Sequence, residues 1–239
     1  LTHPYGQWKD TGIRLEGDAV RSLTVTFLEM WNAVSDRDEN DTEFSRFLTD
    51  YPYEAQQTGF IQPYADSPMD NEQVGEEVYI SMVNKAEKYC WFITPYLIIT
   101  DEMAHALTLA AKRGVDVRII TPGIPDKKLI YSVTRSFYHE LVKDGVHIYE
   151  WTPGFCHAKM SVADDCMATC GTINLDYRSL YLHFEDGVWI YRNQVIHDIK
   201  KDFTDTLEYC NPVSLEFCRG RNIAVRAMQS ILRLFAPML

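Results

Sequence analysis

Residues 156–185 read CHAKMSVADDCMATCGTINLDYRSLYLHFE, and they decide the fold that we expect for this chain. The polar residues of the stretch fall into two spaced groups, H-x-K-x4-D and then G-T-x-N: His157, Lys159 and Asp164, followed by Gly171, Thr172 and Asn174. If residues 157–164 form a strand, alternate side chains share a face, so His157 and Lys159 point the same way. The opposite face is apolar and suited to packing: Ala158, Met160 and Val162. An imidazole beside an ammonium suits phosphate chemistry, because the ammonium can hold a phosphoryl oxygen while the imidazole attacks phosphorus or moves a proton.

This spacing resembles the signature of the phospholipase D superfamily, H-x-K-x4-D-x6-G-S-x-N, with Thr172 where serine is usual. Threonine keeps the hydroxyl. The wider stretch 152–185 is most similar to bacterial cardiolipin synthases of this superfamily. The resemblance implies a phospholipase D-like α/β fold, a mixed β-sheet flanked by helices on both faces, in which two such motifs meet at one active site. A histidine and a lysine that alternate on a strand are otherwise typical of a solvated edge, but Gly171 and Asn174 in register argue against that alternative.

The resemblance also implies a reaction with two displacements at phosphorus. One histidine attacks and forms a phosphohistidine, a twin histidine protonates the leaving oxygen, and the twin then deprotonates the incoming alcohol. The catalytic residues that the resemblance assigns in this chain are His157, Lys159, Asp164, Asn174 and Glu185. One neutral and one protonated imidazole are needed at the same pH, which the ordinary histidine pKa of about 6.5 allows.

Five polar residues receive roles around the phosphate. Lys159 and Asn174 are expected to bind the nonbridging oxygens and to stabilise the extra charge of the transition state. Thr172 is expected to bind substrate through a further hydrogen bond. Asp164 is expected to organise the motif strand rather than to carry a proton. Tyr96 follows a proline at the carboxyl end of an expected strand, where ligands of α/β proteins often bind, so it is either a substrate contact or a packing residue.

A carboxylate is expected to orient the His157 ring. Glu185 lies 28 residues after His157 and is expected to accept the second ring N–H of that histidine, with Asp186 as the rival. Neither a cofactor nor a divalent metal is implied, because the lysines and histidines already supply positive charge.

Taken as a whole, the resemblance implies a phosphatidyltransferase that makes cardiolipin from two phosphatidylglycerol molecules and releases glycerol. The expected partners are phosphatidylglycerol, a membrane surface, and an N-terminal half or a second copy that supplies the other motif. Three alternatives stay open: another phosphatidyltransferase or a phospholipase of the superfamily, a nuclease that dimerises around one motif, and an inactive accessory module.

Composition narrows the partners. The chain has 239 residues, is 46% hydrophobic and 24% charged, and carries a net charge of -11. This acidic balance argues against a nonspecific nucleic-acid binder, so no nucleic-acid partner is expected. No run of eighteen apolar residues could form a transmembrane helix in this segment. Six cysteines without a C-x2-C pair predict reduced thiols, which together with the resemblance places the chain at the cytoplasmic face of a bacterial membrane.

The first 34 residues look like part of a repeat. Residues 11–16 alternate as a strand does and residues 19–31 carry a helical apolar stripe, in the same order as the expected strand 188–192 and helix 195–209. By resemblance, Asp10 partners the histidine of a first motif that is not in this chain. Together with the absence of an initiator methionine, this predicts a fragment with one of two motifs, inactive by itself.

The remaining chain divides by composition. Residues 1–34 are expected to be the trailing edge of the first half, 35–57 a charge-rich linker, 58–212 the phospholipase D-like domain, and 213–239 a basic amphipathic segment. Strands are expected at 59–65, 90–94, 115–121 and 146–151, and helices at 72–88, 103–112 and 127–143. The last segment carries Arg226, Ser230 and Arg233 on one helical face, which suits either an anionic membrane surface or packing on the core.

Overall fold

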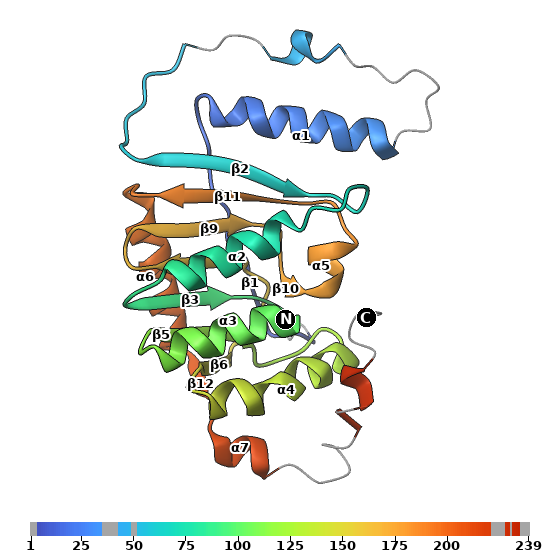
Figure 1. The fold of residues 1–239 in the computed structure, drawn as a ribbon, viewed down its shortest axis with the longest axis vertical. Helices are drawn as coiled ribbons and strands as arrows, with labels where there is room; N and C mark the ends of the chain where they lie inside the picture. Colours follow the sequence, from blue (N-terminus) through green and yellow to red (C-terminus); the bar gives the residue numbers. More distant parts are fainter. Residues whose placement is uncertain (1–3, 35–42, 49–51, 221–227, 230, 235–239) are drawn as a thin grey trace.

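A mixed eight-stranded sheet forms the centre of the molecule, in the order β12-β6-β5-β3-β8-β9-β11-β2 (Figure 1). The computed structural model describes residues 4–34, 43–48, 52–220, 228–229 and 231–234. The strands of this sheet are β2 (Phe60–Asp66), β3 (Tyr89–Ile93), β5 (Asp116–Pro122), β6 (His147–Trp151), β8 (Met160–Ala163), β9 (Met167–Gly171), β11 (Glu185–Tyr191) and β12 (Cys210–Pro212). β3, β5 and β6 run parallel, whereas β8, β9, β11 and β2 pair antiparallel.

Helices cover both faces of this sheet, as the expected fold class requires. One face packs against α2 (Val74–Lys85), α3 (Asp101–Lys112) and α4 (Lys128–Lys143), and the other against α6 (Val195–Leu207). Each helix forms because its apolar residues recur at helical spacing. In α6 the buried stripe is Ile196, Ile199, Phe203 and Thr206. The Thr100 hydroxyl caps α3 by accepting a hydrogen bond from the Met103 amide at 3.1 Å, as the sequence predicted.

Two short parallel ladders lie outside the main sheet. One joins β1 (Gln7–Lys9) to β7 (Gly154–Cys156), and the other joins β4 (Leu97–Ile98) to β10 (Leu175–Asp176). The strand expected at 11–16 is wrong, because those residues form no ladder. Their alternation has another cause: Ile13 and Leu15 pack partly buried against the core on the α6 side of the sheet.

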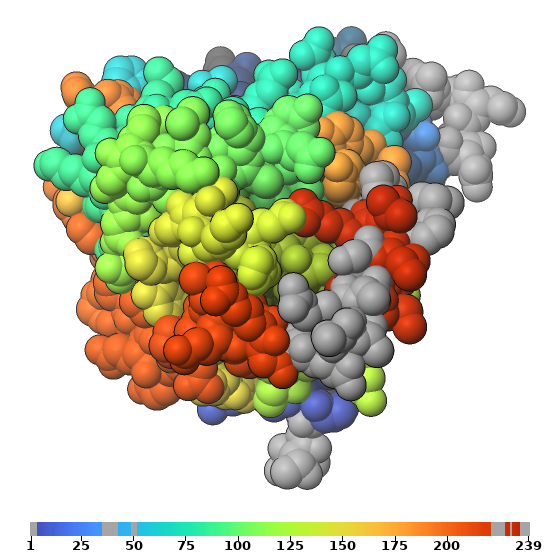
Figure 2. Space-filling model, turned by 60° about the horizontal axis from the view of Figure 1, so that its bottom comes forward, coloured from blue at the N-terminus to red at the C-terminus, as the bar shows by residue number. Residues whose placement is uncertain are grey.

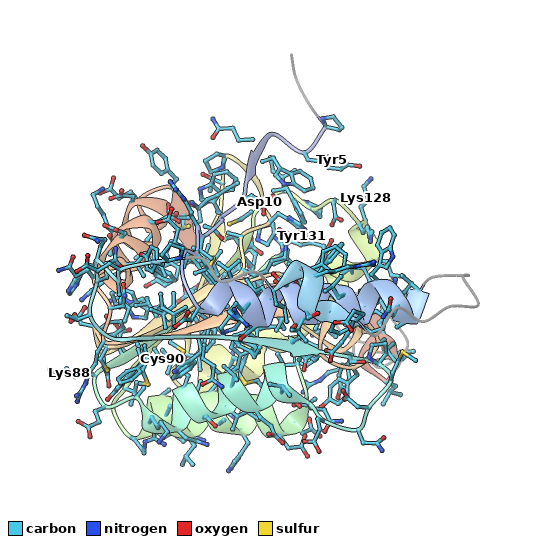
Figure 3. The ribbon with its side chains drawn as sticks, turned by 90° about the horizontal axis from the view of Figure 1, so that it is seen from above. Tyr5, Asp10, Lys88, Cys90, Lys128 and Tyr131 are labelled. Carbon is cyan, nitrogen blue, oxygen red and sulfur yellow. The ribbon has the colours of Figure 1, made fainter. Side chains whose placement is uncertain are left out.

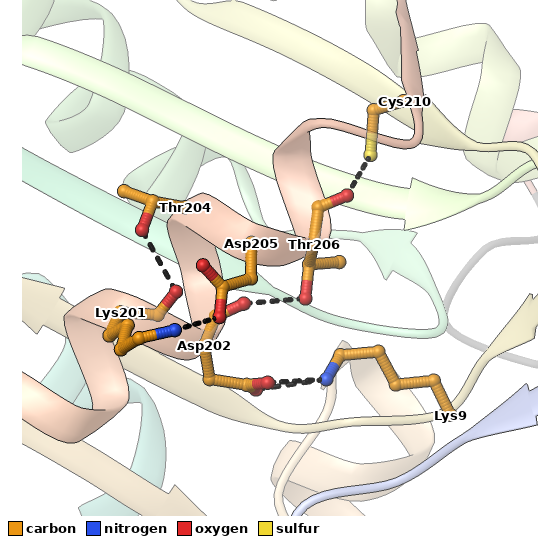
Figure 4. A network of polar contacts seen from close by, with 7 residues as sticks. All are labelled: Lys9, Lys201, Asp202, Thr204, Asp205, Thr206 and Cys210. Carbon is orange, nitrogen blue, oxygen red and sulfur yellow. Dashed lines mark hydrogen bonds and ion pairs between the residues drawn. The ribbon is translucent and has the colours of Figure 1, made fainter.

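The N-terminal segment is fixed to the domain at β1. Gly154 allows the close approach, since a Cβ there would lie 2.0 Å from the Gln7 carbonyl oxygen. The Lys9 ammonium then forms an ion pair with Asp202 of α6 at 2.8 Å. Figure 4 shows this contact beside the polar network of α6, in which the Thr206 hydroxyl donates to the Asp202 carbonyl at 2.6 Å. The residues after β1 are therefore held at a defined place on the domain.

Helix α1 (Ala19–Val34) lies beyond β2 at the edge of the sheet (Figures 1 and 3). The helix confirms the sequence prediction, but none of its residues is buried. The rings of Phe27 and Trp31 lie 6.0 Å apart, and the two residues are 56% and 54% exposed. Of the apolar stripe that predicted this helix, Leu23 is half-buried and Val20, Phe27 and Trp31 are exposed.

The C-terminal residues that are described pack on α4, as Figure 2 shows for the red segment beside the yellow helix. Gln229 donates to the Ser132 carbonyl at 3.1 Å, and Arg233 forms an ion pair with Glu140 at 2.6 Å. The Arg233 guanidinium also lies 4.4 Å from the Phe137 ring centroid. For this part, core packing is the alternative that the structure supports.

Other expectations fall partly outside the described residues. Arg226 and Ser230 of the expected basic face lie there, as do 35–42 and 49–51 of the expected linker. The described part of that linker holds a 3-10 helix, η1 (Phe44–Phe47), and the segment after β12 holds α7 (Leu215–Arg219). Among the helices that the structure describes, none is long and apolar enough to cross a bilayer.

Candidate active site

His157 and Lys159 lie in the three-residue connection between β7 and β8. The strand expected at 157–164 is shorter than predicted, because β8 begins at Met160 and the His157 amide donates instead to the Lys9 carbonyl of β1 at 2.7 Å. The alternation of side chains holds even so. Ala158 is fully buried, while the His157 side chain is 34% exposed. The connection thus presents the imidazole partly to solvent while its backbone is held by β1.

The structure brings the imidazole and the ammonium together. Lys159 Nζ lies 2.8 Å from His157 Nε2 and 3.0 Å from Nδ1, and it donates to the His157 carbonyl at 2.6 Å. Burial lowers the pKa of Lys159 to about 8. Burial and the Lys159 charge also lower the pKa of His157 below its ordinary value. The imidazole is therefore biased toward its neutral form, which is the form that can attack phosphorus or accept a proton.

Asp10 is the carboxylate on the imidazole. Its Oδ1 lies 3.1 Å from His157 Nδ1, and Trp8 Nε1 donates to its Oδ2 at 3.1 Å. The Trp8 and His157 rings are 5.2 Å apart. Asp10 raises the pKa of His157 against the stronger lowering by burial and Lys159. Figure 3 labels Asp10 on the N-terminal segment just after β1. A carboxylate on Nδ1 fixes the tautomer and leaves Nε2 as the reactive atom.

This contact corrects two expectations. Glu185 does not orient His157; its Oε1 accepts from the Ser179 hydroxyl at 3.0 Å and lies 3.8 Å from His183 Nδ1. Asp10 was expected to serve a histidine outside this chain, yet it contacts His157. The cause is register: β1 pairs with β7 so that Lys9 faces Cys156, and the following residues of the two segments then meet. Trp8 was not singled out from the sequence, and no local pattern there indicates it.

Glu185 stands in an acidic and largely dry environment at the start of β11. It lies directly opposite Asp66 in the antiparallel register with β2. Burial raises the pKa of both carboxyls, that of Asp66 to about 6, and the Glu185 charge adds to the shift of Asp66. The Glu185 charge also acts on Lys159, so this carboxylate borders the site without touching the imidazole. Asp186, the rival, is tied through its backbone to Thr172.

The remaining expected substrate contacts separate into two places. The Thr172 hydroxyl donates to the Asp186 carbonyl at 3.2 Å and accepts from its amide at 3.0 Å, so it holds the end of β9 against β11. Asn174 lines a cavity together with Tyr96. Its Oδ1 is buried and has no hydrogen-bond partner among the described residues. The Tyr96 hydroxyl donates to Asp126 at 2.7 Å.

Asp164 belongs to the opposite end of β8. Its carboxylate accepts three backbone N–H groups, from Glu87 at 2.7 Å and from Lys88 and Tyr89 at 2.9 Å each. Seven residues of nearly extended chain place it roughly 20 Å from His157. The structure therefore supports the expected organising role, at a distance that allows no contact with the reacting phosphorus. Figure 3 labels Lys88 on this side of the molecule, away from Asp10.

Known proteins are similar to this chain in sequence and in fold. Residues 79–207, more than half of the chain, match the family described as "Cardiolipin synthase, PLD-like domain". The chain is a cardiolipin synthase-like member of the phospholipase D superfamily. A cardiolipin synthase of Halalkalibacterium halodurans is 34% identical over 98% of this chain and 46% of that protein. An uncharacterized protein of Streptococcus mutans is 46% identical over 98% of this chain and 50% of that protein.

This member of the superfamily thus spans about half the length of the curated relatives that it matches. Solved structures agree on the fold. Phosphatidylserine synthase of Haemophilus influenzae matches 74% of this chain and 45% of its own with a TM-score of 0.59 at 16% identity. The phospholipase D family member Nuc of Salmonella typhimurium matches 66% of this chain and 99% of its own with a TM-score of 0.54 at 16% identity.

Metal ligands do not gather at the site. Within the ranges that the structure describes, no three His, Cys, Asp or Glu side chains lie where they could hold a metal ion together. The positive charge available to a phosphate here comes from Lys159 and from His157 when it is protonated.

The charge balance at His157 gives a direct prediction. Asp10→Asn should lower the pKa of His157 further, because the carboxylate is the group that favours the imidazolium. Lys159→Gln should raise it, because a neighbouring positive charge is lost. Titration of the His157 ring resonances by NMR measures both shifts, with the resonances of His139 on α4 as internal reference. An Asp10→Asn protein in which the His157 pKa rises would contradict the assigned contact.

Proposed function

We propose that this chain supplies one half of the active site of a phosphatidyltransferase that makes cardiolipin from two phosphatidylglycerol molecules. The observation that carries the proposal is the His157–Lys159 contact at 2.8 Å, backed by the Asp10 carboxylate at 3.1 Å. Relatives named cardiolipin synthase align with 98% of the chain, which supports the same reaction here.

The site suits two successive displacements. A histidine nitrogen attacks the phosphorus of the first lipid, the bond from phosphorus to the glycerol oxygen breaks, and that oxygen takes a proton from the second histidine. The hydroxyl of the second lipid then attacks the phosphohistidine, the P–N bond breaks, and the hydroxyl proton passes to the second histidine. His157 fits either histidine role through Nε2, while Lys159 holds a nonbridging oxygen in both transition states.

The second histidine belongs, in this proposal, to another phospholipase D-like unit, from a further part of the protein or from a second copy. Two features support it. The apolar stripe of α1, with Phe27 and Trp31, is exposed, whereas the equivalent stripe of α6 is buried against its sheet. The Glu185 charge acts on Lys159, but the carboxylate contacts no histidine more closely than His183, at 3.8 Å, among the described residues. Asp10 reaches His157 from a segment far away in the sequence, and by analogy Glu185 would orient the histidine of the other unit.

The substrate places the reaction at a membrane surface, because phosphatidylglycerol resides in a bilayer. The cysteines, expected to be reduced thiols, favour the cytoplasmic face of that membrane. Another phosphatidyltransferase or a phospholipase of the superfamily would use the same residues with a different acceptor, so the acceptor is the point to test.

Vesicles of phosphatidylglycerol labelled in the terminal glycerol distinguish these acceptors. The full-length enzyme, or this chain combined with its second unit, should release one glycerol for each cardiolipin formed, and a monomer of this chain should release none. Release of glycerol with phosphatidic acid as the lipid product would show that water is the acceptor, which would overturn the synthase assignment in favour of a phospholipase.

A further inference from the structure

A cavity of about 450 Å³ opens beside the candidate active site. It lies between the start of α4, the short helix α5 (Tyr177–Tyr181) and β10. Tyr96 and Asn174 belong to its wall. The Tyr96 ring lies 6.1 Å from that of Phe155, which in turn lies 5.8 Å from the His157 ring. The volume is in the range of small-molecule sites, and the Phe155 ring lies between Tyr96 of the cavity wall and the imidazole.

Positive charge in this cavity is left without a partner. Lys127 and Arg178 line it with exposed side chains, and within the described residues no hydrogen bond or ion pair holds either of them. The nearby acids are engaged: Asp126 accepts from the Tyr96 hydroxyl at 2.7 Å and from the Lys127 amide at 2.7 Å. Asp176 is buried and accepts from the Ser179 amide at 2.9 Å. In a chain with a net charge of -11, two unpaired cations at one cavity indicate an anionic ligand.

The rest of the lining restricts which anion fits. Ile98, Leu129 and Ile130 form an apolar wall beside the cations. Asn174 Oδ1, buried and without a partner, is an acceptor that needs a donor, and a phosphate oxygen cannot supply one. A ligand that satisfies all three features carries a phosphate, a hydroxyl and an apolar part. Phosphatidylglycerol has this combination.

The proposed reaction uses two such lipids, and His157 and Lys159 are assigned to the phosphate that reacts. The acceptor brings a phosphate of its own, separated from the attacking hydroxyl by the three carbons of glycerol, or roughly 6 Å at about 1.5 Å for each bond. We propose that the cavity binds the acceptor lipid, with Lys127 and Arg178 on its phosphate and Asn174 Oδ1 accepting from its glycerol.

This inference rests on the proposed function and adds the residues that choose the acceptor. In the second displacement the acceptor hydroxyl oxygen bonds to phosphorus, the P–N bond breaks, and the proton passes to the second histidine. Lys127 and Arg178 take no part in these bond changes. They set how strongly an anionic acceptor binds, and a neutral acceptor gains nothing from them.

Two acceptors separate these roles in the full-length enzyme. Arg178→Gln, Lys127→Gln and the double variant should raise the KM for phosphatidylglycerol as acceptor by about tenfold or more, which is the loss of one or two charge-assisted hydrogen bonds. Exchange of labelled free glycerol, a neutral acceptor, into phosphatidylglycerol should stay within about twofold, because this reaction has no acceptor phosphate for Lys127 and Arg178 to bind. The matched control is Lys128→Gln. Lys128 is the exposed neighbour of Lys127, is labelled in Figure 3 and lies outside the cavity lining.

Equal losses with both acceptors, or no loss with either, would overturn the acceptor site. Binding separates this result from a failure of the proposed function. The chain is titrated with soluble short-chain phosphatidylglycerol in a Lys159→Gln background, which weakens binding at the reacting site. The Arg178 and Lys127 variants should bind this lipid more weakly, and the Lys128→Gln control should not. If the wild-type enzyme transfers to neither acceptor, the proposed function fails. The titration then tests lipid binding by the cavity separately, and unchanged affinity in both variants refutes the acceptor site.

Discussion

Replacement of His157 by alanine in the full-length enzyme should abolish phosphatidyl transfer, with kcat falling by about 10⁴-fold or more. In the proposed reaction the imidazole is the group that forms a bond to phosphorus or carries the proton. Lys159 stands 2.8 Å from its Nε2 and Asp10 stands 3.1 Å from its Nδ1. Neither an ammonium nor a carboxylate can replace a nitrogen that alternates between nucleophile and leaving group. The measurement is the initial rate of cardiolipin formation from labelled phosphatidylglycerol.

The controls distinguish chemistry from folding. His139→Ala removes a partly buried histidine from α4, away from the site, and should leave transfer within about twofold. The His157 side chain is 34% exposed, so its loss should leave the urea midpoint nearly unchanged. A His157→Ala enzyme that retains a tenth of the wild-type rate would refute the assignment.

The architecture was within reach of the sequence because it depends on local periodicity. Apolar repeats placed β2, α2, β3, α3, β5, α4, β6, β11 and α6 within a few residues, and the Thr100 cap followed from residue chemistry. The short elements β4, β7, β10 and α5 were not predicted. The motif spacing likewise placed His157 beside Lys159, since alternation requires no knowledge of the rest of the fold. These features are set by neighbours in the chain.

The carboxylate on the imidazole could not be predicted in the same way. Asp10 and His157 are separated by 147 positions, and they meet only because β1 pairs with β7 in one register. Spacing after the motif favoured Glu185 instead, and the strand expected at 11–16 had alternation but no neighbour to pair with. Long-range pairing depends on the whole fold, so local pattern says little about it.

A second large effect is expected at the other end of β8, on stability rather than on chemistry. Asp164→Gly should lower the free energy of unfolding by about 3 kcal/mol, because the Asp164 carboxylate accepts hydrogen bonds from three backbone N–H groups. Each hydrogen bond to a charged group contributes roughly 1.5–3 kcal/mol at most. Two of the three bonds are exposed, and water replaces part of what they contribute. Urea denaturation followed by circular dichroism measures the change.

Glycine is the informative substitution because Asp164 has a φ of +52°, a conformation that costs a non-glycine residue energy. Glycine keeps that backbone conformation and removes the carboxylate alone. Arg192→Gly is the matched control, at a φ of +52° with a side chain that stacks on Tyr191, and it should be close to neutral. If Asp164→Gly kept full stability but lost transfer, Asp164 would have to act on the phosphate. The expected result is the reverse of that for His157: stability falls and the chemistry of the folded fraction persists. The two polar ends of one short strand then serve separate purposes, because a carboxylate that binds backbone amides roughly 20 Å from the imidazole can order the strand but cannot reach the phosphorus.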